Sequence, residues 1–157
     1  MVFSIALRVV GERGTAEEVA QDVFVQLHKS GEGLESAEHV RFWLRRVAVH
    51  RATDALRRRA SRPESWAEEW VEEKQEAPMQ TLSSLMMGAR LEELLLGLPE
   101  TMRVAVTLRY QEEMAPEEIA AVLEQPVATV KSNLQRGLKM LRRKAAVTMK
   151  EYVREQV

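Results

Sequence analysis

The sequence predicts an all-α protein with two small helical domains joined by an acidic linker, the C-terminal domain being a helix-turn-helix. Three observations lead to this prediction. Apolar residues recur at helical spacing nearly everywhere, and no strand-like alternation persists. The 7 glycines and 5 prolines are fewer than an average composition would give in 157 residues. A Glu-rich stretch flanked by prolines divides the helical segments into two groups.

The N-terminal domain is predicted over residues 1–62 and ends before Pro63. Its helical segments are predicted at residues 4–10, 15–29 and 37–59. The first has the pattern of the end of a helix closed by Gly11, so the beginning of that helix is expected to be missing. Thr15 is the predicted N-cap of the second segment, with Glu18 three residues on as in a capping box.

The linker is predicted over residues 63–81, with a transient helix at most, over 64–75. The C-terminal domain follows over 82–157. Its helices are predicted at residues 82–98, 101–111, 115–123 and from 127 past 144. The short third helix, the tight break at Glu124-Gln125-Pro126 and the long last helix have the spacing of a helix-turn-helix.

The net charge of −1 argues at first sight against a nucleic-acid partner, but the charges are arranged in blocks. Residues 41–62 contain eight arginines and one acid, and residues 125–150 contain seven basic residues and no acid. Acidic stretches lie between them. Since a duplex responds to the potential within about 8–10 Å, two basic faces on a nearly neutral protein are compatible with DNA binding. The alternative is two solvated helix faces.

The helix-turn-helix provides the first candidate site. An apolar stripe from Val127 to Leu141 is expected to face the core, which leaves short polar and cationic groups pointing outward at the helix start. A recognition helix reads base edges with such groups at this place, and basic residues further along suit phosphates. The predicted DNA contacts are Thr129, Lys131, Ser132, Asn133, Gln135, Arg136 and Lys139. The alternative is an ordinary antiparallel helix pair with a polar surface.

The Arg-rich helix over 37–59 provides the second candidate site. Cationic grooves with aromatic platforms bind unpaired bases, and this helix has both kinds of group. The candidate contacts are Trp43, Arg46, His50, Arg51, Asp54, Arg57 and Arg58. For Trp43, filling the core is a stronger alternative than stacking on a base. For His50, the alternative is a solvated histidine, because no second ligand stands at metal-binding spacing.

The sequence gives no support for catalysis, metal or cofactor binding, or membrane insertion. The absence of cysteine excludes disulfides, Cys-based zinc sites and thiol nucleophiles. There is no Gly-rich phosphate loop, zinc-spaced His-Glu pair or nucleophile elbow. No stretch has the length of a membrane span or the pattern of a secretory signal, so a cytoplasmic protein is expected.

Several motifs then suggest a family. The N-terminal half contains Glu17-Glu18-Val-Ala-Gln21-Asp22-Val-Phe24, Trp43-Leu44-Arg-Arg-Val47-Ala48 and Asp54-Ala-Leu-Arg57-Arg58. The C-terminal half contains Leu98-Pro99-Glu100, Leu108-Arg109-Tyr110, Glu117-Glu118-Ile119-Ala120 and Pro126-Val127-Ala128-Thr129-Val130-Lys131-Ser132. Together, and in this order, they resemble regions 2 and 4 of bacterial RNA polymerase sigma factors of the extracytoplasmic-function (ECF) group, in the sigma-70 family.

The resemblance implies a non-catalytic subunit that binds core RNA polymerase and promoter DNA. The stretch with Gln21, Asp22 and Phe24 matches the part of the family that docks on the polymerase. The Arg-rich helix matches the part that melts and reads the downstream (minus-ten) element as a single strand. The helix from residue 127 matches the reader of the upstream (minus-thirty-five) element in the major groove. An inhibitory partner, an anti-sigma factor, is common in the family, but no residue here identifies one.

The sequence departs from the family pattern at several places. His50 stands where many members carry an asparagine that helps to capture a flipped base, Glu124 where the turn often has glycine, and Asn133 where arginine is common. The first part of region 2 is missing, which is expected to expose apolar surface. Two other interpretations stay open: a stand-alone helix-turn-helix regulator that binds duplex DNA as a dimer, and a truncated sigma-like adaptor that binds only a protein partner.

Overall fold

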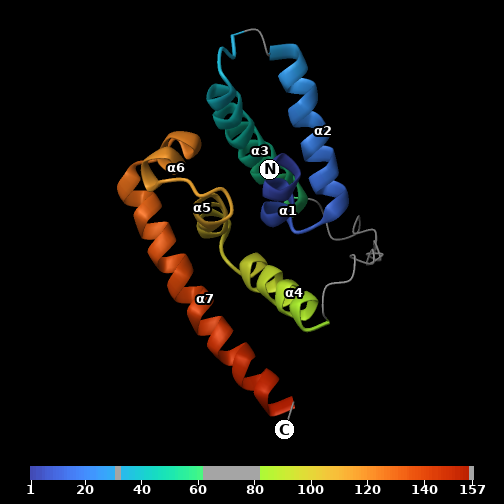
Figure 1. The fold of residues 1–157 in the computed structure, drawn as a ribbon, viewed down its shortest axis with the longest axis vertical. Coiled ribbons are helices and arrows are strands. Elements are labelled where there is room, and N and C mark those ends of the chain that lie inside the picture. Colours follow the sequence, from blue (N-terminus) through green and yellow to red (C-terminus); the bar gives the residue numbers. More distant parts are fainter. Residues whose placement is uncertain (31–32, 62–81, 156–157) are drawn as a thin grey trace.

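The fold of the chain is all-α, as predicted (Figure 1). The structure is a computed structural model, and it describes residues 1–30, 33–61 and 82–155. Within these ranges there are seven helices and no strand. The linker expected over 63–81, with its transient helix, lies outside the described residues.

The N-terminal half consists of α1 (Val2–Val10), α2 (Arg13–Ser30) and α3 (Ala37–Ala60). Helices α2 and α3 form an antiparallel hairpin, and α1 packs against both near their lower ends (Figure 1). Gly11 closes α1 in the left-handed conformation (φ 77°), as its place in the sequence predicts. Ser36 caps α3 by accepting a hydrogen bond from the His39 N–H at 3.1 Å.

The predicted start of α2 is wrong by two residues. Thr15 does not cap the helix, because α2 already begins at Arg13. The carboxylate of Glu12 instead accepts from the N–H of Gly14 (2.9 Å), from the N–H of Thr15 (3.1 Å) and from the Thr15 hydroxyl. A longer acidic side chain therefore satisfies the free N–H groups of the first turn, where the helix dipole also favours negative charge.

The C-terminal half consists of α4 (Leu82–Leu96), α5 (Glu100–Tyr110), α6 (Pro116–Leu123) and α7 (Val127–Glu155). Helix α7 is the longest and packs against each of the other three. It approaches α5 closely at Gly137, where a Cβ atom would lie 3.1 Å from Cγ2 of Val106. Lys144 of α7 donates to the Gly97 carbonyl at 2.6 Å and so ties the helix to the end of α4.

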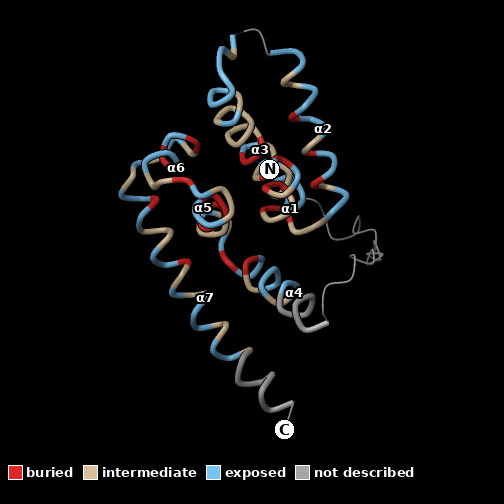
Figure 2. Tube along the Cα trace, in the orientation of Figure 1, coloured by how far each residue is buried: buried red, intermediate tan, exposed pale blue. Residues whose placement is uncertain are grey.

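One hydrophobic cluster extends from the N-terminal half into the C-terminal half. It includes the fully buried side chains of Ile5, Val23, Val49, Leu108 and Ile119, from five helices. Figure 2 shows buried positions in red on helices of both halves. The contact between the halves is close at the end of α1, where a Cβ at Gly11 would lie 2.5 Å from Cδ2 of Leu96. Arg103 of α5 also donates to the Val9 carbonyl at 2.6 Å. The halves are therefore packed together through α1, α4 and α5.

No helix in the described part of the chain is long and apolar enough to cross a membrane.

Candidate nucleic-acid interface

The helix-turn-helix is formed by α6, a turn and α7. Glu118 accepts a hydrogen bond from the Ala115 N–H at 2.6 Å, which fixes the start of α6. The turn is made by Glu124, which adopts the left-handed conformation (φ 54°, ψ 43°) usually taken by glycine. The carbonyl of Pro126 then accepts from the N–H groups of Thr129 and Val130 and so begins α7. Four buried side chains hold the two helices together: Ile119, Val122, Val130 and, from α5, Leu108.

Five of the seven predicted reading residues of α7 are exposed, and two are less exposed than their predicted outward position indicates. The side chains of five are exposed: Thr129, Lys131, Gln135, Arg136 and Lys139. Ser132 and Asn133 are half-buried. The helix therefore presents cationic and hydrogen-bonding groups to solvent from its first turn onward, while Val130 faces the core.

Lys131 has an acidic neighbour in α6. Its Nζ lies 3.4 Å from Oε1 of Glu117, and both side chains are exposed. The pKa of Glu117 lies below its ordinary value, first because its carboxylate is hydrogen-bonded by its own backbone N–H and then because of Lys131. The carboxylate stays charged at neutral pH and competes with any phosphate or base for Lys131.

The candidate residues of α3 are not all free, because several are engaged by the C-terminal half. Arg46 forms an ion pair with Glu124 in the helix-turn-helix turn. Nη2 of Arg57 lies 3.1 Å from Oε1 of Glu100 at the start of α5.

His50 also lies at the boundary between the halves. Its Nε2 lies 3.3 Å from the carbonyl oxygen of Val122 in α6. The alternative of a solvated histidine is therefore correct for the exposure of the ring, but Nε2 also has a backbone oxygen as its partner.

The other α3 candidates have neighbours within the N-terminal half. Arg51 donates to Oε1 of Gln26 in α2 at 3.1 Å, and Arg58 donates to the Asp54 carbonyl at 3.4 Å. Trp43 is half-buried and packs against the hydrophobic cluster, which agrees with its predicted alternative as a core residue. A cavity of about 190 Å³ lies between α2 and α3 and is lined by Gln26, Arg46, Val47, His50, Arg51 and Asp54.

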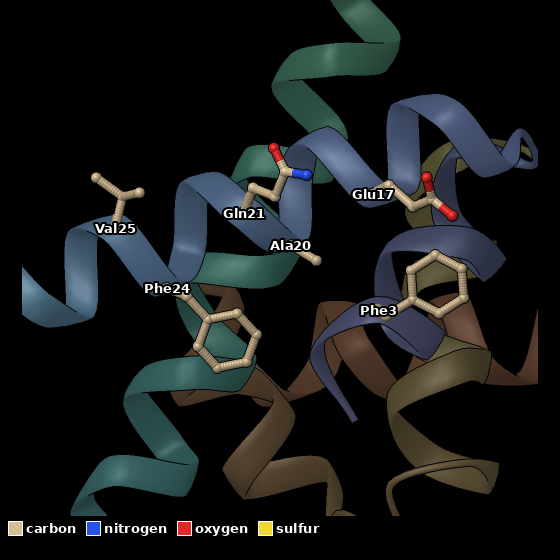
Figure 3. A pocket seen from close by; sticks show the side chains of 6 residues that line it. All are labelled: Phe3, Glu17, Ala20, Gln21, Phe24 and Val25. Carbon is tan, nitrogen blue, oxygen red and sulfur yellow. The ribbon is translucent and has the colours of Figure 1, made fainter.

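The residues expected to bind the polymerase lie on the outer face of α2. Gln21, Asp22 and Phe24 are all exposed. Gln21 and Phe24 line a hollow of about 550 Å³, and the ring of Phe3 reaches the same side from α1 (Figure 3). Phe24 and Val25 are each about half exposed, at 54% and 52%, which is unusual for large apolar side chains next to each other. Apolar surface is therefore exposed in the region 2-like half.

Sequence reasoning missed two features of these surfaces. Phe3 was not predicted to join the hollow, although its place on the α1 face opposite Ile5 follows from helical spacing. The acids Glu100, Glu112 and Glu124 were not predicted to meet the arginines of α3. The sequence signal was the acidic block that follows the linker, but local spacing cannot tell which distant segment such a block faces.

A metal site has no structural support in the described residues, because no group of three or more His, Asp or Glu side chains there is placed to hold an ion.

Comparisons with known proteins match each half of the chain to a family model. The family model for sigma-70 region 2 matches residues 1–62, and the model for sigma-70 region 4 matches residues 88–141. Together they cover about three quarters of the chain. Region 2 therefore contains α1, α2 and α3, and region 4 contains the helix-turn-helix.

Relatives over most of the chain are similar as well. The ECF RNA polymerase sigma factor SigW of Bacillus subtilis is 24% identical, and the match covers 90% of this chain and 81% of that protein. The ECF RNA polymerase sigma factor SigE of Mycolicibacterium smegmatis is 31% identical over 90% of this chain and 56% of that protein. The ECF RNA polymerase sigma-E factor of Escherichia coli is 29% identical, and the match covers 87% of this chain and 76% of that protein.

A solved structure has the same fold. It is the sigma factor RpoE of Bartonella quintana in complex with the anti-sigma factor NepR, with a TM-score of 0.73 and 19% identity. The match covers 93% of this chain and 90% of that chain.

Proposed function

The chain belongs to the sigma-70 family, in its ECF group of RNA polymerase sigma factors, and from this we propose which of its surfaces bind the polymerase and the promoter. Sigma factors initiate transcription and are not themselves enzymes. In this chain the region 2 helix bundle comes first and the region 4 helix-turn-helix follows it. We therefore treat residues 1–62 and 82–157 as the two functional units and residues 63–81 as the linker between them.

The N-terminal part of α7 reads the upstream promoter element in the major groove. The single observation that carries this assignment is the row of exposed polar and cationic groups at the start of the second helix of a helix-turn-helix. Lys131 and Gln135 lie one turn apart and reach base edges, since lysine pairs with guanine and glutamine with adenine in that groove. Arg136 and Lys139 contact phosphates, as do Thr129, Ser132 and Asn133 at the groove edge.

Helix α3 binds the downstream element as a single strand. Its arginines form a cationic face, and phosphates supply most of the affinity of such a strand. His50 and Arg51 line the cavity of about 190 Å³ between α2 and α3, together with Arg46 and Asp54. Trp43, packed on the core cluster, supports the helix at this place, and Arg57 and Arg58 extend the cationic face.

Helix α2 docks on core RNA polymerase. Gln21 and Asp22 supply polar groups beside the half-exposed ring of Phe24. An apolar centre with a polar rim is the usual composition of a protein–protein interface. The chain then acts in the cytoplasm with the polymerase and has no catalytic site of its own.

Transcription from purified components tests this assignment. Run-off transcription with core polymerase and a pool of genomic fragments is expected to depend on the added protein and to identify its promoters. Transcripts that form equally well without the protein contradict the proposal, and tight binding to a palindromic duplex without polymerase indicates a stand-alone regulator instead.

The pair Lys131→Ala and Gln135→Ala tests the upstream assignment. Because each good base contact contributes about 1–3 kcal/mol, the loss of two contacts should weaken binding of an upstream-element duplex by at least about thirtyfold. Binding of the downstream strand should change little. The matched control replaces His28 and Lys29, which are exposed at the end of α2, by alanine. Equal losses at both promoter elements contradict the assignment.

A further inference from the structure

Lys131 differs from the other cations that α7 presents to DNA, because a carboxylate lies beside it. Its Nζ is 3.4 Å from Oε1 of Glu117, the second residue of α6. Among the ion pairs of the described residues, this is the only one that involves a cation of α7. Arg136 and Lys139, which are assigned to phosphates, are exposed and have no such partner there. The acid therefore lies beside the cation of α7 that is assigned to a base edge.

The carboxylate of Glu117 is held in place independently of Lys131. Its own backbone N–H, at the start of α6, donates to it, and this bond is the main reason why its pKa lies below the ordinary value. Arg109, whose Nη1 donates to the Met114 carbonyl at 2.9 Å, brings a second positive charge close to this carboxylate. The first turn of a helix also favours negative charge. Glu117 is thus a charged and oriented acceptor to which the ammonium of Lys131 is attracted.

A lysine side chain by itself discriminates poorly between bases and phosphates. Its ammonium is a point charge on a flexible aliphatic stem, and either kind of acceptor can bind it. The pair with Glu117 uses one of the three donors of Lys131 and leaves two for the O6 and N7 acceptors of a guanine. Because the pair restricts the position of the ammonium before DNA arrives, less freedom is lost when the base is bound.

The same carboxylate weakens the attraction of α7 for DNA of any sequence. Sequence-independent binding comes from cations that neutralise phosphates, and Glu117 reduces the contribution of Lys131 to this term. At the correct base, the ammonium bridges the guanine and the carboxylate. At a wrong base, the donors of Lys131 lack acceptors and the carboxylate lies close to a negatively charged duplex. An acid at this place therefore increases the difference between right and wrong sequences while it lowers the affinity for both.

We propose that Glu117 is a positioning residue for promoter recognition: its carboxylate directs the ammonium of Lys131 to a guanine of the upstream element and lowers the affinity of α7 for other sequences. Glu117 acts through Lys131 and touches no base itself, and its role rests on the proposed function of α7 as the reader of that element. An exposed ion pair changes an equilibrium by at most about fivefold, which sets the size of the effect.

Competitive run-off transcription measures this effect. Two templates are offered together to polymerase that carries the full chain. They differ at one base pair of the upstream element of a mapped promoter, and in the length of the transcript. The ratio of the two transcripts gives the preference at that base pair, and incomplete assembly of a variant with the polymerase does not alter it. Lys131→Ala identifies the guanine that Lys131 reads, as the position at which this variant loses its preference.

The test variant is Glu117→Gln, which removes the charge and keeps the side-chain shape. Its preference for this guanine should fall about two- to fivefold, while transcription from the substituted template should stay equal or rise. Damage to α6 would instead lower transcription from both templates. The matched control is Glu93→Gln, which removes an exposed acid of α4, apart from α6 (Figure 1), and should leave the preference unchanged. An unchanged preference in Glu117→Gln overturns the proposal.

Glu117→Gln combined with Lys131→Ala tests whether Glu117 acts through Lys131. Glu117 has nothing to position in that background, so the added change should not alter the preference further. A second fall of about two- to fivefold shows that Glu117 contacts the DNA by itself, and overturns the proposal. A Lys131→Ala variant that keeps its preference at every base pair of the element contradicts the proposed role of α7 as well. The failure of the inference and that of the proposed function are therefore distinguishable.

Discussion

Glu124 gives a sharp test of how the helix-turn-helix turn is stabilised. Its backbone adopts φ 54° and ψ 43° as the residue that ends α6, with its N–H bonded to the Ala120 carbonyl. For a residue with a Cβ atom, this conformation costs roughly 1–2 kcal/mol, and glycine does not have that cost. Replacing Glu124 by glycine removes the strain but also removes the carboxylate that pairs with Arg46.

Two variants separate the two effects. Glu124→Gln keeps the strain and removes the charge, and its cost should be at most about 1 kcal/mol because both partners are well exposed. Glu124→Gly also removes the strain. Its gain is reduced by about 0.4–1 kcal/mol, because glycine gives the unfolded chain more freedom. We therefore expect Glu124→Gly to be more stable than Glu124→Gln by about 0.5–1 kcal/mol, a Tm difference of about 1–4 °C.

Urea unfolding followed by circular dichroism measures this difference. Ala121→Gly is the control, because Ala121 is exposed within α6 and glycine inside a helix should lower the stability by about 1 kcal/mol. Glu113→Gly should behave like Glu124→Gly, since Glu113 has φ 55°. A Glu124→Gly protein no more stable than Glu124→Gln would refute the strain argument.

Two further predictions concern contacts within and between the halves. Arg103→Leu leaves the Val9 and Leu98 carbonyls without their donor. It should lower the free energy of unfolding, measured by urea unfolding, by about 1–3 kcal/mol. A change below about 0.3 kcal/mol would contradict this role of Arg103. The pKa of Glu12 is lowered chiefly by the hydrogen bond from the Thr15 hydroxyl. The charged carboxylate should therefore stabilise the fold fully at pH values above its unfolded pKa of about 4.3. This stabilisation should be lost as the pH falls through the lower pKa of the folded state. The stability gap between the natural protein and Glu12→Gln should therefore close at acid pH, and a gap that is constant down to the lowest pH would contradict the role of Glu12.

Local patterns in the sequence predicted much of the fold. Apolar spacing placed all seven described helices, because each buries one face and the spacing of that face is visible in the sequence. The start of α2 was missed because Glu12 reaches its free N–H groups from before the helix, which the usual capping pattern does not include. Helix α7 continues to Glu155, beyond Leu141 where the predicted apolar stripe ends, since no glycine or proline follows Gly137 to stop the helix.

The contacts between the halves could not be predicted in the same way. Arg46 and Glu124 are 78 positions apart, and Arg45 and Glu112 are 67 apart, so no local period relates them. The charge blocks showed only that opposite charges were available. Which arginine meets which acid depends on how α1 packs against α4 and α5, and that packing depends on buried shape at places such as Gly11 and Leu96.

The position of these acids has a consequence for the near-neutral net charge. Asp54 is the only acid among the eight arginines of residues 41–62, so α3 cannot neutralise itself by pairs along its own helix. An exposed arginine-rich helix binds nucleic acid of any sequence, with an affinity set by salt. Glu124 and Glu100 of the C-terminal half instead pair with two of its arginines, Arg46 and Arg57. The charge that compensates α3 therefore comes in part from distant segments of the chain, which is why the near-neutral net charge says little about the electrostatic potential of α3 itself.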